Sequence, residues 1–244
     1  MDDAGEWSKG GSRILRHSGR EADWKAPAHA EDELIGDHVE RTIGPVESVY
    51  HELISDLVHV DVHWVKATAQ RPFHVLVTSG MSALPMAVPE GVKACHAELI
   101  ALLPPDWRMD QESWKDERWY WPIRWLKVLA RFPHEHRTWL GGGHTLPNGD
   151  PPQPYARGTA LCCALLLGSL SLAAEAQELT LPTGAPLRFW TLYPLHAEEM
   201  AFKLNHGTEA LIDEFERARV GDVIDPRRPS AVKPPPRKKL FGLF

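Results

Sequence analysis

The sequence predicts an α+β fold, a mixed or antiparallel β-sheet packed against helices in a single domain. Its β-rich runs follow one another through hairpin-length links, and only one long helical pattern stands between strands. A regular βαβ array would instead alternate the two kinds of element. The 244 residues fit one generous domain. With 43% hydrophobic and 25% charged residues, the composition excludes collagen-like, coiled-coil and wholly disordered classes.

Six stretches have the β-branched and aromatic content that is typical of strands. Residues 49–54 and 57–65 are separated by Ser55 and Asp56, which predicts a hairpin. The other four predicted strands are 73–78, 95–103, 160–167 and 187–193.

Three stretches have helical spacing of their apolar residues. Residues 34–42 predict a short helix that ends at the Gly44-Pro45 pair. Residues 119–132 predict a longer helix, with Pro122 in its first turn and Pro133 as its stop. Residues 194–218 predict a helical region that is interrupted near 205–207.

The chain divides into three parts by composition. Residues 1–33 are polar and lack a sustained period, so we expect a mobile N-terminal lead-in. Residues 34–229 form the predicted domain. Residues 230–244 are basic and apolar, and the three prolines at 234–236 disfavour a helix, so we expect a disordered C-terminal tail.

The formal net charge of −6 conceals a strong charge asymmetry. From Arg227 onward there are six basic residues and no acidic one, whereas residues 1–226 hold 21 basic and 33 acidic residues, a net charge of −12. Such a body gains no counterion release from a phosphate backbone, which excludes general nucleic-acid binding. It suits a basic protein partner through electrostatic steering.

The cysteines and the N-terminus predict a cytoplasmic protein. Three cysteines, two of them adjacent at Cys162 and Cys163, match neither a disulfide framework nor a zinc ribbon. The acidic N-terminal residues lack the apolar core of a signal peptide. The uncharged run 158–174 is short for a membrane span and contains Gly, Ser and Thr, so a buried strand is the preferred interpretation and we expect no stable membrane insertion.

Alternation along the strand 57–65 places three polar side chains on one face. These are His59, Asp61 and His63, residue types that bind zinc or iron. Further ligands are available at His134, Glu135, His136 and His144. None of these spacings matches a dedicated metal motif. The preferred interpretation is therefore a polar strand surface, and we predict no metal or cofactor. A metal-dependent enzyme that uses this face stays open as the alternative.

No nucleophile motif is complete. Residues 79–82, Ser-Gly-Met-Ser, lack the GxSxG pattern and predict a turn. Residues 141–143 are three glycines without the lysine of a phosphate loop, which indicates a mobile backbone. Cys162 and Cys163 lie in the most apolar stretch, where thiols react poorly. The sequence therefore predicts a protein without enzymatic activity and without catalytic residues.

Six tryptophans fall within 33 residues around the predicted long helix. We expect at least half of them in the core and the others on a recognition surface, because Trp is enriched in binding hot spots. They are Trp107, Trp114, Trp119, Trp121, Trp125 and Trp139.

The C-terminal tail offers a further alternative function. The protein would then be a peripheral membrane adaptor that attaches through the basic residues of the tail and through Phe241 and Phe244.

Several unusual blocks, in order, resemble the suppressor of fused domain family in its bacterial form. The blocks are HVDVHWV, RPFHVLVTSGMSALPMAVPEG, HAELIALLPPDW, WPIRWLKVLARFP, TWLGGGHTLP and FWTLYPLHAEEMAFKLNHGTEAL, within a resemblance that runs from about residue 35 to residue 229. It implies an α+β domain that binds proteins and catalyses no reaction. Bacterial relatives have been proposed as immunity proteins of polymorphic toxin systems, so the expected partner is a toxin domain.

The resemblance also directs attention to the segment after the long helix. Animal members reach their peptide there with an acidic residue just before a histidine, and this chain has Gly143 before His144. Peptide capture of that kind is therefore not carried over. Trp139, His144 and the free edges of the sheet are the expected partner-binding positions, by β-strand addition.

Overall fold

In a computed structural model, which describes residues 6–14, 32–51 and 59–232, an eight-stranded mixed β-sheet organises the chain. The strand order is β3-β4-β5-β6-β10-β8-β7, and β9 pairs with β10. The strands are β3 Val46–Tyr50, β4 Asp61–Val65, β5 His74–Ser79, β6 His96–Leu103, β7 Thr145–Pro147, β8 Cys163–Leu167, β9 Glu178–Thr180 and β10 Pro186–Leu195.

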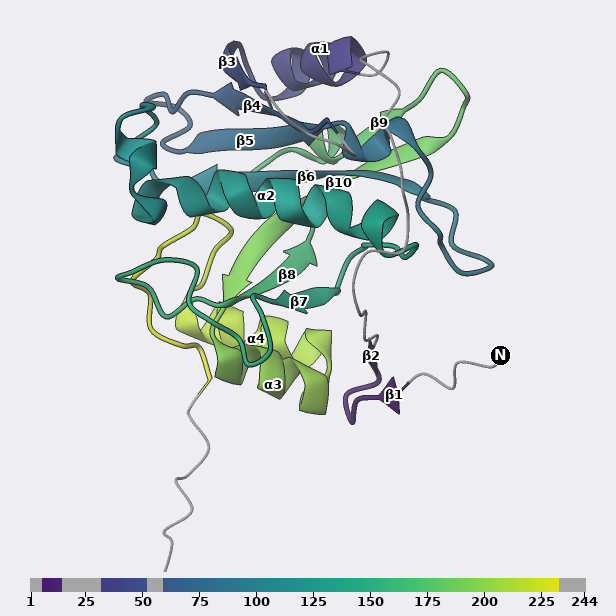
Figure 1. The fold of residues 1–244 in the computed structure, drawn as a ribbon, viewed down its shortest axis with the longest axis vertical. Helices are drawn as coiled ribbons and strands as arrows, with labels where there is room; N and C mark the ends of the chain where they lie inside the picture. The colour runs from purple at the N-terminus through teal and green to yellow at the C-terminus, as the bar shows by residue number, and fades with distance from the viewer. Residues whose placement is uncertain (1–5, 15–31, 52–58, 233–244) are drawn as a thin grey trace, which may run out of the picture.

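Four helices cover this sheet: α1 Asp32–Thr42, α2 Glu117–Glu135, α3 Ala197–His206 and α4 Thr208–Ala218. Short 3-10 helices are η1 Met81–Ala83, η2 Ser113–Lys115 and η3 Ala174–Gln177. In Figure 1, α2 lies across one face of the central strands, α1 lies beside β3 and β4, and α3 and α4 lie together beyond β8 and β7. Neighbouring strands pair antiparallel except β6 and β10, which are parallel. This arrangement confirms the predicted α+β class.

Hydrophobic side chains fill both faces of the sheet. On the α2 side, Leu126 and Leu129 pack with Val62 of β4 and Leu99 of β6. On the opposite side, Ile35 and Val39 of α1 belong to a second cluster with strand residues Val75, Val77 and Ile100. Val62 belongs to the first cluster and Val65 to the second, on opposite faces of the sheet, which confirms the alternation predicted along β4. A third cluster joins α4 to β8 and β10 through Leu211, Phe215, Leu165 and Tyr193.

The predicted helices and strands are present with shifted ends. Pro133 does not stop the long helix at once. Its missing N–H removes one hydrogen bond of the last turn, but the helix continues for two residues, to Glu135, and His136 N donates to the Phe132 carbonyl. The break predicted near 205–207 is Gly207, whose φ of 92° separates α3 from α4. β7 and β9 were not predicted, because three residues are too few to show the alternation that is typical of a strand.

Part of the predicted lead-in has a defined structure. β1 (Glu6–Trp7) and β2 (Arg13–Ile14) form an antiparallel pair, and Gly10 N donates to the Leu204 carbonyl of α3 at 2.8 Å. The last two residues of the predicted lead-in, 32 and 33, begin α1. Residues 1–5 and 15–31 of the lead-in, residues 52–58 of the predicted hairpin, and the tail from residue 233 lie outside the described residues. Ala231 and Val232, the last described residues, pack into the cluster around α4.

The uncharged run at 158–174 contains β8, whose first four residues are buried between β7 and β10. The structure therefore agrees with the buried-strand interpretation. Within 6–14, 32–51 and 59–232, none of the helices combines the length and the apolar character that crossing a bilayer demands.

Candidate functional site

Two histidines and one aspartate meet where the chain passes from β3 to β4. Asp61, the first residue of β4, is only 2% exposed. His51 Nδ1 lies 2.7 Å from its Oδ2, and His59 Nε2 lies 2.9 Å from its Oδ1. The three ligand atoms lie within 4.8 Å of one another, and no other set with this geometry occurs in the described part of the chain. We call these residues the His-Asp cluster.

The cluster differs from the set that the sequence suggests. His59 and Asp61 belong to it, but the His63 ring turns toward β5, where its Nε2 lies 2.9 Å from Ser79 Oγ. His51 takes its place. None of His134, Glu135, His136 and His144 joins the cluster, and His134 instead pairs its Nε2 with the Met81 carbonyl at 2.8 Å.

A buried lysine adds a positive charge near the cluster. Lys127 of α2 is 8% exposed, and its Nζ donates to the Tyr50 carbonyl at 3.5 Å. Burial lowers the pKa of Lys127, and the nearby charge of Asp61 acts in the opposite direction. The Asp61 carboxylate therefore has a cationic neighbour in addition to two imidazoles.

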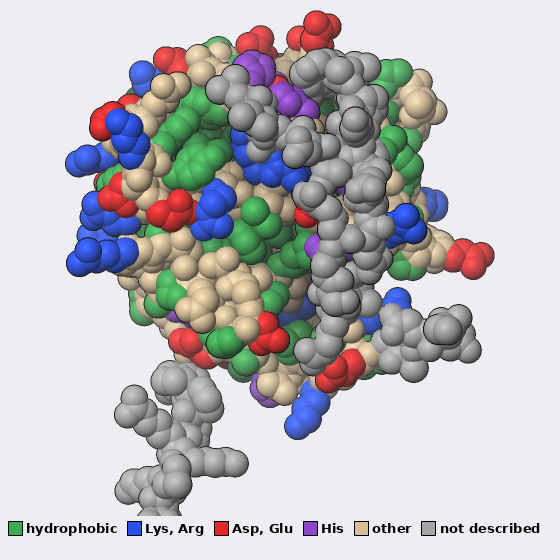
Figure 2. Space-filling view, in the orientation of Figure 1, with side chains coloured by type: hydrophobic (Ala, Val, Ile, Leu, Met, Phe, Trp, Pro, Cys, Tyr) green, Lys and Arg blue, Asp and Glu red, His purple; other side chains and the backbone are tan. Residues whose placement is uncertain are grey.

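Four half-buried aromatic side chains surround the same end of β3, and we call them the edge aromatic cluster. Tyr50 lies 4.4 Å from Trp114 edge-to-face and 6.2 Å from Trp64 in a stacked arrangement, between ring centroids. Tyr120 completes the cluster, 6.2 Å from Trp114. Figure 2 shows hydrophobic side chains gathered in patches on the face that α2 covers in Figure 1, bordered by charged ones. Partly exposed aromatic rings beside polar groups are typical of binding surfaces.

Three of the six tryptophans around α2 lie in the core, in line with the expectation for at least half of them. Trp107, Trp121 and Trp125 are buried, and Trp121 stacks on Tyr155 with centroids 4.7 Å apart. The other three, Trp114, Trp119 and Trp139, are half-buried against the same core.

Trp139 and His144, the positions expected to bind a partner, touch each other. Their ring centroids are 4.3 Å apart in an edge-to-face arrangement. Burial lowers the pKa of His144, and the charge of Lys203 lowers it further, so the ring is neutral at pH 7. β7 follows directly, but it has three residues and ends in Pro147, which has no N–H. Among the described residues, β3, with five residues, is the longer of these two edges and has a strand partner on one side only.

The three glycines before His144 are required by close packing. A Cβ on Gly141 would lie 2.7 Å from the Trp139 ring, and one on Gly142 would lie 2.9 Å from the Trp190 ring. Gly143 has a φ of 81°. Tight contact with two tryptophans, not the predicted backbone mobility, therefore accounts for this run.

The Ser-Gly-Met-Ser turn is held by a buried carboxylate. Glu98 of β6 is fully buried, and its Oε1 accepts hydrogen bonds from Gly80 N at 3.0 Å, Ser82 N at 2.8 Å and Ser82 Oγ at 2.7 Å. Its Oε2 accepts from Thr78 Oγ1 at 2.5 Å. Ser82 Oγ thus stabilises the turn, in line with the prediction that residues 79–82 form a turn.

The two adjacent cysteines are buried. Burial raises the pKa of both Cys162 and Cys163, which keeps these thiols protonated and unreactive.

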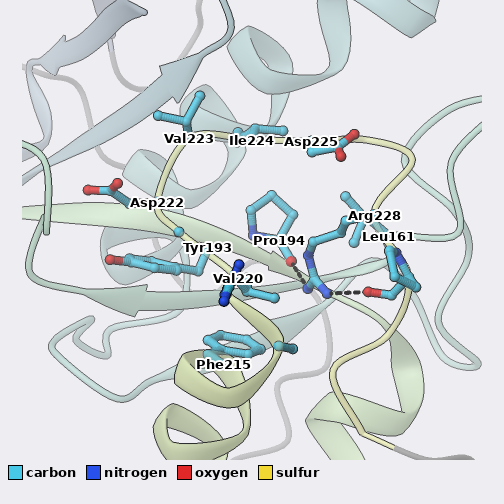
Figure 3. Close-up of a pocket in the computed structure, with 14 residues that line it drawn as sticks. Leu161, Tyr193, Pro194, Phe215, Val220, Asp222, Val223, Ile224, Asp225 and Arg228 are labelled. Carbon is cyan, nitrogen blue, oxygen red and sulfur yellow. Dashed lines mark hydrogen bonds between the residues drawn. The ribbon is translucent and has the colours of Figure 1, made fainter.

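A cavity of about 280 Å³ lies between α4, β10 and residues 219–229 (Figure 3). Arg228 donates to both carboxylate oxygens of Glu199 at 2.6 Å and to the Pro194 carbonyl at 2.8 Å. Asp222 accepts from the hydroxyls of Ser169 and Ser171 at 2.6 Å. Both of these charged residues are committed to the fold, so they offer a ligand little free hydrogen-bonding capacity.

The environment of the Asp222 carboxylate predicts that the stability of the fold depends on pH. Burial acts to raise its pKa, but hydrogen bonds from Ser169 and Ser171 outweigh that effect and lower the pKa overall. The stabilisation it provides is therefore fully present above the unfolded-state pKa of about 3.9 and is lost as the pH falls through the lower folded-state value. We expect Asp222→Asn to be less stable than the wild type at pH 7, by a margin that shrinks below about pH 4. Urea unfolding at pH 7, 5, 4 and 3 measures this margin, and a margin independent of pH would contradict the prediction.

Comparison with known proteins decides the family. The sequence profile of the suppressor of fused protein (SUFU) family matches residues 56–229. The chain belongs to this family. The resemblance noted in the sequence is thereby confirmed. Members of the SUFU family act in protein–protein interactions, and one of the solved structures described next is a Sufu–Fu complex.

Solved structures of the SUFU type share the fold. A SUFU homologue from Neisseria gonorrhoeae has 17% sequence identity and a TM-score of 0.62, covering 84% of this chain and 98% of its own. The Sufu–Fu complex matches with 14% identity and a TM-score of 0.58 over 82% of this chain and 91% of that one. Drosophila Suppressor of Fused matches with 14% identity and a TM-score of 0.50, over 71% of this chain and 42% of its own. No curated protein matches the sequence.

Sequence reasoning missed His51, although a signal for it existed. In the antiparallel register, Tyr50 pairs with Val62, so the next residue along β3 lies opposite Asp61. A hairpin prediction that included the register would have brought His51 to the aspartate. The register depends on the length of the connection, which was placed at residues 55 and 56 by composition alone.

Proposed function

We propose that this SUFU-family chain is a non-enzymatic binding domain whose protein partner docks at the β3 edge. The observation that carries the proposal is the edge aromatic cluster, four half-buried rings beside a five-residue strand that ends the strand order of the described sheet. Aromatic side chains dominate binding hot spots, and a free strand edge can pair with an extended segment of a partner. β3 joins both features at one end of the sheet.

We further propose that the partner is a toxin domain and that the chain acts as an immunity-type protein in the cytoplasm. The immunity role that has been proposed for bacterial members of the family supplies the precedent. The net charge of −12 over residues 1–226 supports a basic partner, for which steering raises the association rate. Three unpaired cysteines, two of them buried, are in keeping with a reducing compartment.

Trp139 and His144 form a second proposed contact surface. They are half-buried, lie in direct ring contact and precede the β7 edge. This surface and the edge aromatic cluster belong to opposite ends of the strand order, so variants distinguish them cleanly.

Co-expression tests the immunity role. The product of the adjacent reading frame is produced in a bacterial host with and without this chain. We expect toxicity from the partner alone, its relief on co-expression, and a complex that co-purifies. Absence of both the complex and the relief would refute the immunity role.

Two single substitutions test the docking surface. We expect Tyr50→Ala and Trp114→Ala each to weaken partner binding by about 30-fold, which corresponds to a hot-spot contribution of about 2 kcal/mol. Titration calorimetry measures the affinity, and circular dichroism checks that the variants are folded.

Leu170→Ala is the matched control, because Leu170 is an apolar side chain that is 76% exposed and lies outside both surfaces. We expect it to bind like the wild type. Trp139→Ala and His144→Ala report on the second surface. Loss of affinity in these two variants alone would move the docking site from β3 to β7.

A further inference from the structure

The His-Asp cluster has the composition of a transition-metal site. We propose that His51 Nδ1, His59 Nε2 and an Asp61 carboxylate oxygen bind one Zn²⁺ ion, with a fourth position open to water. Two imidazoles and one carboxylate are ligands that zinc prefers, whereas Mg²⁺ and Ca²⁺ require mainly oxygen ligands. The binding needs no partner protein, so it stands independently of the proposed function.

The distances require only a small adjustment. The two nitrogens lie 2.7 and 2.9 Å from the Asp61 oxygens, and all three ligand atoms fall within 4.8 Å of one another. Ligand atoms about 2.0–2.1 Å from a tetrahedral zinc are roughly 3.3 Å apart. Admitting the ion therefore requires each nitrogen to withdraw from its carboxylate oxygen by about 0.4–0.6 Å, and the ligand atoms that lie up to 4.8 Å apart to approach one another to about 3.3 Å.

The burial pattern allows that movement and gives the ion access. The Asp61 side chain is 3% exposed, which fixes the negative charge in place. His59 is 33% exposed and His51 is 63% exposed, so the more mobile ligand lies on the solvent side. An ion can enter past His51, and the same side leaves one coordination position to water.

A simple hydrogen-bonded arrangement explains less of the geometry. An imidazole as exposed as His51 gains little from a hydrogen bond to a carboxylate, because water competes for both groups. Yet both histidines direct a ring nitrogen at the same buried carboxylate, one to each oxygen. A divalent cation accounts for the convergence of all three groups.

Zinc at this position would tie the end of β3 to the start of β4. His51 directly follows Tyr50, the last residue of β3, and Asp61 is the first residue of β4. In the described part of the chain, β3 is an edge strand with a strand partner on one side only. Because an ion that binds only the folded state adds to its stability, zinc should raise the melting temperature.

The test uses full-length, tag-free protein that has been treated with a chelator and titrated with ZnCl₂ by calorimetry. We expect one Zn²⁺ per chain and a higher melting temperature at saturation. Co²⁺ in place of zinc should produce the intense visible absorption of a four-coordinate site. A stoichiometry near zero in the wild type would overturn the proposal.

Three variants locate the ligands. We expect His51→Ala and His59→Ala each to lower the zinc affinity at least tenfold, and His51, being exposed, can be removed without loss of the fold. His63→Gln is the matched control, since it retains a hydrogen-bonding partner for Ser79 and should bind zinc like the wild type. Affinity that survives both alanine substitutions, or that is lost in His63→Gln, would refute this ligand set.

Discussion

Replacing Arg228 by alanine is expected to lower the free energy of unfolding by about 3–5 kcal/mol. The Glu199 side chain is fully buried, and Arg228, 11% exposed, donates to both of its carboxylate oxygens. Without the guanidinium, a negative charge would stay in the interior with only backbone donors, His196 N and Ala231 N. Such an uncompensated charge is among the most destabilising changes in a folded protein. Urea denaturation of wild type and variant measures the loss.

Arg227→Ala is the matched control, because it removes the same charge from the neighbouring residue. Arg227 is exposed, and only its backbone N–H bonds to Asp225. We expect a change within about 0.5 kcal/mol. Equal effects of the two substitutions would show that Arg228 acts through net charge and not through the buried pair.

Replacing Glu98 alone by alanine is expected to lower the free energy of unfolding by about 3–5 kcal/mol, as much as Arg228→Ala. The carboxylate accepts four hydrogen bonds, which hold residues 78–82 against β6. Its removal leaves buried backbone and hydroxyl donors without an acceptor, and each such donor costs about 1–3 kcal/mol. Thermal and urea unfolding of the variant measures the effect.

Glu90→Ala is the matched control, because it distinguishes the effect of removing a buried carboxylate on stability from the effect of removing a negative charge. Glu90 is an exposed acidic residue, so its removal should change stability by less than about 0.5 kcal/mol. If Glu98→Ala were equally mild, the buried carboxylate would not be what holds the Ser-Gly-Met-Ser turn.

The strong periodic patterns of the sequence predicted the fold well. The three- and four-residue spacing in α2 reflects its buried face, and the alternation in β4 separates the side chains of its two faces, both of which are buried. Local sequence records both properties directly. The ends of elements were harder to predict. α2 continues for two residues past Pro133, although the proline removes one hydrogen bond of its last turn, and β7 is held by its partner β8 despite its short length.

The candidate site was predicted in part. His59 and Asp61 follow from alternation, but His63 shares their face and still turns away to Ser79. His51 enters the His-Asp cluster through the pairing of β3 with β4, ten residues along the chain from Asp61. Alternation indicates which side of a strand a residue occupies, whereas pairing decides which residues meet across strands.

The basic C-terminal stretch shows the same division. Composition marked residues from Arg227 onward as a positively charged end, and the opposite charge of the preceding chain was evident by counting. Only the fold shows that Arg228 turns inward to Glu199 while Arg227 stays exposed.

The sequence by itself determined the α+β class, the family, the acidic body and most of the helices and strands, because these properties depend on local pattern and composition. The tertiary structure decided which polar side chains meet: His51 with Asp61, Arg228 with Glu199, and Glu98 with the turn at 79–82. These pairs join residues that are 10, 29 and 16–18 positions apart. The physical reason is that strand register and packing set such contacts, and neither is encoded within a single element.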